Sequence, residues 1–295
     1  MRDISVSAVI PAFNERRSVA AVAEGVREAL SGRVKDFEVI VVDDGSTDET
    51  ADAARSVKAV LVSHPVNRGY GQALQTGIGA ARFDWVLTID ADGSYPPGEI
   101  HKLLEFAPTF DLVIGTRTGV HFWGSPHRAL LRWIYLRIAG FIIGERVPDA
   151  NSGLRLVRKS LASQEEGPVE CRGYSHSTTM TLSFLSAGRL VKFTPVEYRA
   201  REGRSKVRPL RDILRTLQIM AQVLIAYNPL KLFAALAAAF LAASAAFLWE
   251  FHRRHGAPWL AAAAVSALSA LLCFLTGCIL DSIRMQGRRQ RENPQ

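Results

Sequence analysis

The sequence predicts an α/β fold with a mainly parallel sheet, followed by two helices that cross a membrane. Over residues 6–114, short apolar segments typical of buried strands alternate with segments whose apolar residues recur at helical spacing. Near the C-terminus, residues 232–249 and 256–280 carry no charged side chain. Each of these two segments is long enough for a helix to span the ~30 Å hydrocarbon core of a bilayer.

Five strands and four helices are predicted for the sheet domain. We expect strands at residues 6–10, 37–42, 59–62, 85–89 and 111–114, because each is a short apolar run. We expect helices at residues 18–30, 47–56, 72–81 and 99–106, the second with Ser46 or Thr47 as its N-cap.

Polar or glycine-rich residues follow all five predicted strands. These clusters are residues 11–15, 43–48, 67–71, 90–92 and 115–117. The carboxyl ends of parallel strands meet at one edge of a sheet, and ligands bind there. The sequence therefore predicts a single crevice lined by all five clusters.

Asp90 and Asp92 are the most informative pair in that set. They follow an apolar strand, and alternation along an extended chain directs both side chains to the same side. Two converging carboxylates are costly unless a cation lies between them, and Mg²⁺ typically binds one or two carboxylates together with substrate phosphates. A pair of solvated loop aspartates is the alternative.

The ordered set of motifs resembles family 2 of the inverting glycosyltransferases, which have the GT-A nucleotide-sugar-binding, Rossmann-like fold. The segments that carry this resemblance are residues 11–15, 43–46, 67–71, 90–92 and 115–117. Residues 149–155 and 198–206 are similar to those of the dolichyl- or polyprenyl-phosphate sugar transferases within that family. The resemblance covers roughly residues 5–210.

The resemblance implies a role for each matching position. Asp90, Asp92, Arg117 and Arg128 are the expected catalytic residues, and Mg²⁺ or Mn²⁺ is the expected cofactor, bound by Asp92 and Asp90 with Ser94 nearby. The family commonly has Gln where this chain has Ser94, which leaves the identity of the metal open. Residues expected to bind the UDP- or GDP-sugar donor are Pro11, Phe13, Glu15, Asp43, Asp44, Asn67, Gly71, Asp90, Ala91, Arg201, Ser205 and Lys206.

The chemistry of the acceptor distinguishes two mechanisms. A sugar hydroxyl needs a general base, whereas a phosphomonoester, with a second pKa of about 6, is already anionic at neutral pH. The chain offers arginines rather than an acidic base motif after residue 150: Arg117, Arg128 and Arg132 are the expected acceptor-phosphate ligands. We therefore expect polyprenyl phosphate, such as dolichyl or undecaprenyl phosphate, as the acceptor, attacking the anomeric carbon with inversion.

Residues 126–146 predict a strongly apolar helix. Arg128 and Arg132 lie one turn apart on the same face, and Trp133 and Tyr135 suit a lipid headgroup boundary. We interpret this helix as an interfacial element that brings polyprenyl phosphate to the site; a core helix with snorkelling arginines is the alternative.

The predicted organisation has four parts. Residues 1–206 form a cytoplasmic catalytic domain, 207–228 a juxtamembrane amphipathic helix, 229–284 a transmembrane hairpin and 285–295 a basic cytoplasmic tail. We expect no cleaved signal peptide, so the catalytic domain and both termini lie in the cytoplasm. Lys231 and Arg284 then satisfy the positive-inside rule, while Arg253 and Arg254 mildly violate it.

The net charge of +8 arises from basic residues beside the predicted spans, which favours anionic lipids as partners over nucleic acid. Three cysteines form no zinc or disulfide pattern. Alanine-rich faces, such as residues 261–264, permit homo-oligomer formation.

The sequence is also compatible with other functions. One is a catalytically silent, membrane-anchored scaffold that binds nucleotide-sugars, and another is a family 2 transferase that acts on a hydroxyl acceptor. A processive polysaccharide synthase is disfavoured, since residues 129–133 lack the glutamine of that motif. Neither the sugar nor the choice between UDP and GDP can be assigned from the sequence.

Overall fold

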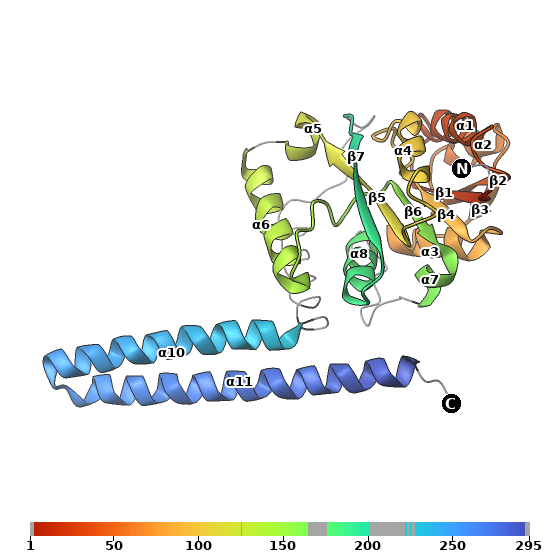
Figure 1. Cartoon of the computed structure of the whole chain (residues 1–295). Helices are drawn as coiled ribbons and strands as arrows, with labels where there is room; N and C mark the ends of the chain where they lie inside the picture. Colours follow the sequence, from red (N-terminus) through yellow and green to blue (C-terminus); the bar gives the residue numbers. More distant parts are fainter. Residues whose placement is uncertain are drawn as a thin grey trace. The chain divides into compact units, whose positions relative to one another are not determined.

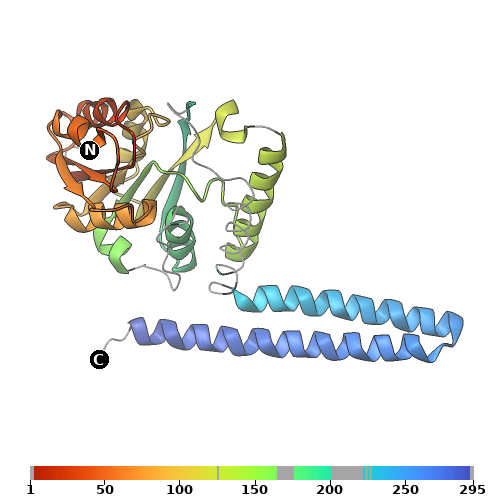
Figure 2. The same cartoon turned by 180° about the vertical axis from the view of Figure 1, so that it is seen from behind.

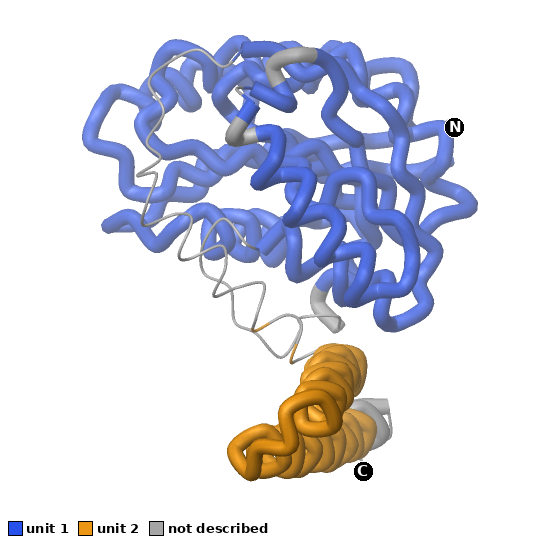
Figure 3. The backbone as a smooth tube through the Cα atoms, turned by 90° about the vertical axis from the view of Figure 1, so that its left-hand side faces the viewer, with its two compact units in different colours: residues 1–216 blue, residues 217–295 orange. Residues whose placement is uncertain are grey.

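The structure, a computed structural model, describes residues 3–124, 126–164, 176–200, 222, 225 and 228–292. The chain separates into two compact units, residues 1–216 and 217–295 (Figure 3).

Seven strands of the described first unit form one sheet, in the order β3-β2-β1-β4-β6-β5-β7 (Figure 1). The strands are β1 (Val6–Ala12), β2 (Phe37–Asp43), β3 (Val60–Ser63), β4 (Trp85–Thr88), β5 (Leu112–Thr118), β6 (Arg155–Arg158) and β7 (Val191–Glu197). The first five correspond to the five predicted strands, and the predicted α/β fold with a mostly parallel sheet is confirmed.

Strand β6 is the antiparallel member of the sheet. It lies between β4 and β5 and runs against both, so that β5 remains parallel to β4. The register pairs Ala12 with Asp43 and Asp43 with Ser63, which aligns the carboxyl ends of β1, β2 and β3. Because β6 runs in the opposite direction, the loop before it reaches the edge where the parallel strands end.

Helices cover both faces of the sheet (Figures 1 and 2). One core layer contains α1 (Val19–Leu30), α2 (Thr50–Arg55) and α4 (Ile100–Leu104), and the other contains α3 (Tyr70–Ala80), α7 (Lys159–Gln164) and α8 (His176–Ser186). Alternation along β2 divides its side chains between the layers: Val39 and Val41 pack on the first, Ile40 and Val42 on the second. Because both faces of the sheet are buried, its strands are continuous apolar runs in the sequence.

Helix α2 begins at Thr50, three residues later than predicted. Ser46 and Thr47 do not cap it, because both bond to the loop after β1: the Asn14 N–H donates to Ser46 Oγ at 2.9 Å and the Thr47 N–H donates to Asn14 Oδ1 at 2.8 Å. Asp48 instead accepts from the Thr50 N–H at 3.1 Å. The loops after β1 and β2 are thus held together directly.

Two further helices follow β5. They are α5 (Val120–Trp123) and α6 (Pro126–Ile143), the latter within the predicted helix at 126–146. Helix α6 exposes Leu130, Leu131, Trp133 and Phe141, each at least 46% accessible. An exposed row of large apolar side chains on one helix indicates a surface that contacts something other than water.

The second unit is a pair of packed helices, α10 (Pro229–Arg254) and α11 (Ala257–Glu292). Both are long and apolar enough to cross a membrane, and most of their apolar side chains are exposed. The helices touch closely where Gly277 meets Phe233, and Ser244 Oγ donates to the Ala263 carbonyl at 2.9 Å. Most of the helix predicted at 207–228 lies outside the described residues.

Two glycines of α3 provide a matched test of how this helix packs against the sheet of the first unit. A Cβ at Gly77 would lie 2.3 Å from Val9 Cγ1, whereas a Cβ at Gly79 meets nothing within 4 Å. We expect Gly77→Ala to destabilise the protein by about 1–3 kcal/mol, since it overpacks the interface between α3 and β1. Gly79→Ala should stabilise it by up to about 1 kcal/mol through helix propensity. Denaturation midpoints in detergent measure both, and equal shifts would contradict the packing of α3 on the sheet.

Candidate active site

A cavity of about 560 Å³ lies at the carboxyl edge of the sheet. Its wall follows the strand order: residues after β1, β2 and β3 form one end, residues after β4 the middle, and Arg117, Asn151, Ser177 and Tyr198 the other end. After the ligands that the sequence predicts, we call these the nucleoside end, the centre and the acceptor end. The predicted convergence of the five clusters on one crevice therefore agrees with the geometry.

Asp44 organises the nucleoside end. Its buried carboxylate accepts from His64 Nδ1 at 2.7 Å and from the backbone N–H groups of Arg68 and Gly69 at 2.9 and 2.8 Å. Gly69 has φ 98°, a conformation that glycine adopts readily and that lets successive N–H groups face one carboxylate. Pro11, Phe13 and Glu15 line the same end, so that apolar surface lies beside acceptor oxygens.

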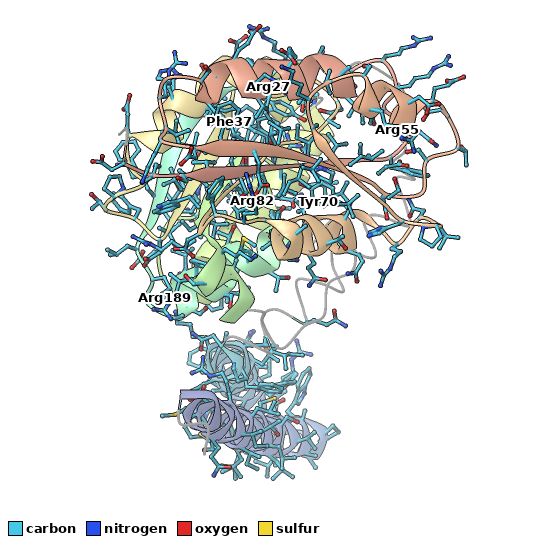
Figure 4. The ribbon with its side chains drawn as sticks, turned by 90° about the vertical axis from the view of Figure 1, so that its right-hand side faces the viewer. Arg27, Phe37, Arg55, Tyr70, Arg82 and Arg189 are labelled. Carbon is cyan, nitrogen blue, oxygen red and sulfur yellow. The ribbon has the colours of Figure 1, made fainter. Side chains whose placement is uncertain are left out.

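Asp90 and Asp92 lie at the centre. Asp90 Oδ1 accepts from the Tyr70 hydroxyl at 2.8 Å (Figure 4 labels Tyr70, on helix α3), and Asp92 Oδ1 accepts from the Ser94 N–H at 3.0 Å. Burial and the neighbouring charge of Asp92 raise the pKa of Asp90 to about 6. A carboxyl group with this pKa favours a bound cation, since the cation would offset both causes of the shift.

The donor set at the centre fits a hard divalent cation. Two carboxylates face one cavity, and no group of three or more His, Cys, Asp or Glu residues capable of holding a metal occurs in the part of the chain that the structure describes. Mg²⁺ and similar ions are commonly held by one or two carboxylates and completed by substrate phosphates and water. Zinc, which takes three or four protein ligands, does not fit this set.

Arg117 and Asp149 form a bidentate ion pair at the acceptor end. Arg117 Nε and Nη2 lie 2.8 and 2.9 Å from the two oxygens of Asp149, and the Arg117 N–H also donates to Asp149 at 3.2 Å. Although burial opposes the charge, the carboxylate and nearby tyrosines raise the pKa of Arg117. The guanidinium is therefore a permanent, oriented cation at this end of the cavity.

Arg155 fixes the loop that carries Asp149 and Asn151. Its fully buried guanidinium donates to the carbonyls of Ser152 and Ala150 at 2.7 and 2.9 Å and to Thr181 Oγ1 at 2.9 Å. The loop is thereby tied to helix α8, whose first turn contributes Ser177 to the cavity. Burial, together with the charge of Arg155, lowers the pKa of His176 in that turn to about 4.

Arg132 of α6 lies near Arg117. Its guanidinium carbon is 4.4 Å from the centroid of the Phe122 ring, and that of Arg117 is 5.0 Å from the same centroid. Two of the three predicted acceptor arginines, Arg117 and Arg132, thus lie around one aromatic ring, although Arg132 does not line the cavity. The side chain of Arg128, and residues Arg201, Ser205 and Lys206, lie outside the described part of the structure.

Most predicted site residues that the structure describes line the cavity, but Arg132 and three others do not. Asp43 accepts from the Ser46 N–H at 3.1 Å and stabilises the turn after β2. Gly71 is buried in the first turn of α3, where Gly69 faces the cavity instead. Ser94 is fully buried, with its N–H turned to Asp92, and its hydroxyl has no hydrogen-bond partner among the described residues. The predicted residues that do line the cavity are Pro11, Phe13, Glu15, Asp44, Asn67, Asp90, Ala91, Asp92 and Arg117.

Sequence reasoning assigned no role to several residues that the structure places here. Tyr70, Asn151, Ser177 and Tyr198 line the cavity, and Asp149 orients Arg117. Asp149 and Asn151 lie in a motif that supported the family resemblance, so their signal was present. Their position depends on the antiparallel direction of β6, which the short segment 155–158 does not reveal.

Comparison with known proteins identifies the family of the chain. A family model described as glycosyl transferase family 2 matches residues 7–164. An undecaprenyl-phosphate mannosyltransferase of Micrococcus luteus is 30% identical over 215 residues, covering 68% of this chain and 87% of that protein.

Further relatives match over a smaller share of their length. An undecaprenyl-phosphate 4-deoxy-4-formamido-L-arabinose transferase of Pseudomonas fluorescens is 32% identical over 215 residues, which is 70% of this chain and 62% of that protein. The enzyme of the same name from Aeromonas hydrophila is 41% identical over 117 residues, 38% of this chain and 36% of that protein.

Solved structures share the fold. Glucosyl-3-phosphoglycerate synthase of Mycobacterium tuberculosis, in complex with phosphoglyceric acid, superposes with a TM-score of 0.61 at 24% identity, covering 76% of this chain and 80% of that one. The same enzyme in complex with Mn²⁺, UDP and glucosyl-3-phosphoglycerate gives a TM-score of 0.56 at 25% identity, covering 76% and 78%. The family match over residues 7–164 and the similarity to the Micrococcus luteus transferase establish that the chain belongs to glycosyl transferase family 2 and is a glycosyltransferase.

Proposed function

We propose that the enzyme transfers a sugar from a UDP- or GDP-sugar to the phosphate of a polyprenyl phosphate such as undecaprenyl phosphate, with inversion at the anomeric carbon. The observation that carries this proposal is the set of side chains at the acceptor end. Among the described residues that line it, Arg117 supplies a cation and no side chain is a carboxylate. Asp149, the nearby acid, has both oxygens engaged by Arg117.

This arrangement suits a nucleophile that is ionised before it binds. A phosphomonoester is already anionic at neutral pH and needs positioning rather than deprotonation. Arg117 would orient a phosphate oxygen toward the anomeric carbon, with Arg132 and Arg128 of α6 adding to the positive potential. The acceptor oxygen then forms the new glycosidic bond as the bond to the nucleoside diphosphate breaks. The relatives that are undecaprenyl-phosphate sugar transferases support this choice of acceptor.

The donor would lie along the rest of the cavity. Pro11 and Phe13 offer an apolar wall for the base, while Asp44 and Glu15 offer acceptors for its N–H and the ribose hydroxyl groups. Its diphosphate would then reach Asp90 and Asp92 at the centre. A divalent cation held there, Mg²⁺ or Mn²⁺, would neutralise charge on the departing diphosphate. The solved Mn²⁺ and UDP complex of a protein with this fold supports that assignment.

Membrane attachment would place the site beside its lipid substrate. Helices α10 and α11 would span the bilayer with the catalytic domain and both termini in the cytoplasm. Glu250 pairs with Arg253 and Arg254 at 3.2 and 2.8 Å, which offsets the positive charge of the turn on the outer side. The exposed apolar residues of α6 would contact the cytoplasmic lipid surface, where Arg137 lies over the Trp133 ring at 5.6 Å.

The first experiment assays purified full-length enzyme with undecaprenyl phosphate. Labelled UDP- and GDP-sugars, including mannose and 4-deoxy-4-formamido-L-arabinose donors, are each incubated with Mn²⁺ or Mg²⁺ and with chelator. We expect label in the organic phase from one donor. Chelation or Asp92→Ala should reduce the rate at least ~100-fold, because charge stabilisation by a metal is worth several kcal/mol.

Two results would contradict the proposal, and they differ. Nucleotide-sugar binding without turnover on any acceptor would indicate a silent scaffold. Turnover onto a water-soluble hydroxyl acceptor, with none onto lipid phosphate, would indicate a family 2 transferase that acts on hydroxyl groups.

Trp133 tests the role of α6. We expect Trp133→Glu to raise the KM for undecaprenyl phosphate about tenfold or more, because a charge in the interface opposes insertion by a few kcal/mol. The KM for a short, water-soluble prenyl phosphate should stay within twofold. Val60→Glu, at an equally exposed position on β3, is the matched control and should change neither value. An equal rise of both KM values for Trp133→Glu would argue against a lipid contact.

The raised pKa of Asp90 predicts how metal binding depends on pH. Without metal, Asp90 binds a proton as the pH falls through about 6, and that proton competes with the cation. We expect the Kd for Mn²⁺ to rise about tenfold per pH unit below 6 and to level off above 7. Calorimetric titration between pH 5 and 8 measures this dependence. A Kd that stays constant across that range would show that Asp90 is not coupled to the metal.

A further inference from the structure

The Asp90 carboxylate is enclosed on two sides by groups that no role assigned so far requires. On one side the Tyr70 hydroxyl donates to Oδ1 at 2.8 Å. On the other, Gly153 lies so close that a Cβ there would be 2.3 Å from Oδ2 and 2.4 Å from Oδ1. The carboxylate thus occupies the space that any side chain at position 153 would fill.

Gly153 is itself held in place on both sides of its Cα atom. Its N–H donates to the Tyr95 hydroxyl at 2.9 Å, and its carbonyl accepts from Thr88 Oγ1 at 2.8 Å. Thr88 and Tyr95 belong to the segment that carries Asp90. The surface against which the carboxylate rests is therefore tied to the same strand end and cannot move away independently.

Tyr70 is tied to the nucleoside end by its chain neighbours. The N–H groups of Arg68 and Gly69 bond to Asp44, and the next residue supplies the hydroxyl that bonds to Asp90. Three consecutive residues thus connect a carboxylate of the nucleoside end with one at the centre. We call residues 68–70 the connecting tripeptide.

We propose that Tyr70 and Gly153 are positioning residues that fix the Asp90 carboxylate in its cation-binding orientation before the cation arrives, and that the connecting tripeptide couples this orientation to the nucleoside end. This inference rests on the proposed metal-dependent function. A fixed carboxylate loses less rotational freedom on binding than a mobile one, so preorganisation increases affinity. A neutral hydroxyl suits the task because it stabilises the carboxylate without placing a competing positive charge beside it.

Binding of Mn²⁺ to the full-length enzyme in detergent tests the proposal without relying on turnover. Free Mn²⁺ is measured by electron paramagnetic resonance, first with the metal alone and then with saturating UDP or GDP. We expect Tyr70→Phe to raise the Kd for Mn²⁺ about tenfold, the lower bound for loss of a hydrogen bond to a metal ligand. Gly153→Ala should act in the same direction. UDP or GDP binding without Mn²⁺ should stay within twofold in Tyr70→Phe, since the backbone contacts of Asp44 persist.

Tyr135→Phe is the matched control. It also removes a hydrogen-bonded tyrosine hydroxyl, one paired with Thr178, but it touches neither carboxylate of the centre. Its Kd for Mn²⁺ should equal that of the unsubstituted enzyme. Thermal midpoints for all variants separate loss of folding from loss of metal affinity, and Tyr70→Phe carries the test if Gly153→Ala does not fold.

The outcomes separate this inference from the function on which it rests. An unsubstituted enzyme that binds Mn²⁺, together with a Tyr70→Phe variant whose Kd is unchanged within twofold, overturns the positioning role alone. An unsubstituted enzyme that binds no Mn²⁺, with or without nucleotide, overturns both.

Discussion

The site depends on how one edge of the sheet accommodates several acidic side chains in a shared cavity. Two of them are stabilised within the chain: Asp44 by two backbone N–H groups and His64, and Asp149 by its ion pair with Arg117. Asp90, beside Asp92, has no ion pair among the described residues, and its raised pKa reports the unfavourable charge. At the centre a cation from outside would balance the charge of the two neighbouring carboxylates.

Strand β6, the antiparallel strand of the described sheet, adds Asn151 to the acceptor end of the cavity. In a purely parallel sheet, only loops that follow strands would reach the edge. Because β6 runs the other way between β4 and β5, the loop that precedes it arrives there too. Arg155, the first residue of β6, donates to two carbonyls of that loop and to Thr181 of helix α8. One buried guanidinium therefore fixes the position of the loop relative to α8. Packing of the strand therefore positions the Asp149 carboxylate that orients Arg117.

Continuous apolar runs predicted the first five strands because both faces of the sheet are covered, and strand ends then predicted the location of the site. The residue types in a motif could not show which of two neighbouring residues faces the cavity. Asp43 is the last residue of β2 and bonds within its turn, while Asp44, one residue later, enters the cavity. Ser94 follows a turn that buries its side chain. Strand β6 escaped notice because its four residues begin and end with arginine and resemble a solvated turn until β4 and β5 enclose them.

The choice of acceptor depends on the basicity of the side chains near the acceptor end of the cavity as well as on their charge. Deprotonation of a sugar hydroxyl works best with a base whose pKa lies near the working pH. Among the described residues of the first turn of α8, His176 is the one titratable side chain, and burial together with Arg155 lowers its pKa to about 4. Such an imidazole stays neutral at pH 7 but is a weak base. His176 does not itself line the cavity, and its burial, together with Arg155, makes it a poor general base for the acceptor end. A substrate that brings its own negative charge is therefore the better nucleophile there.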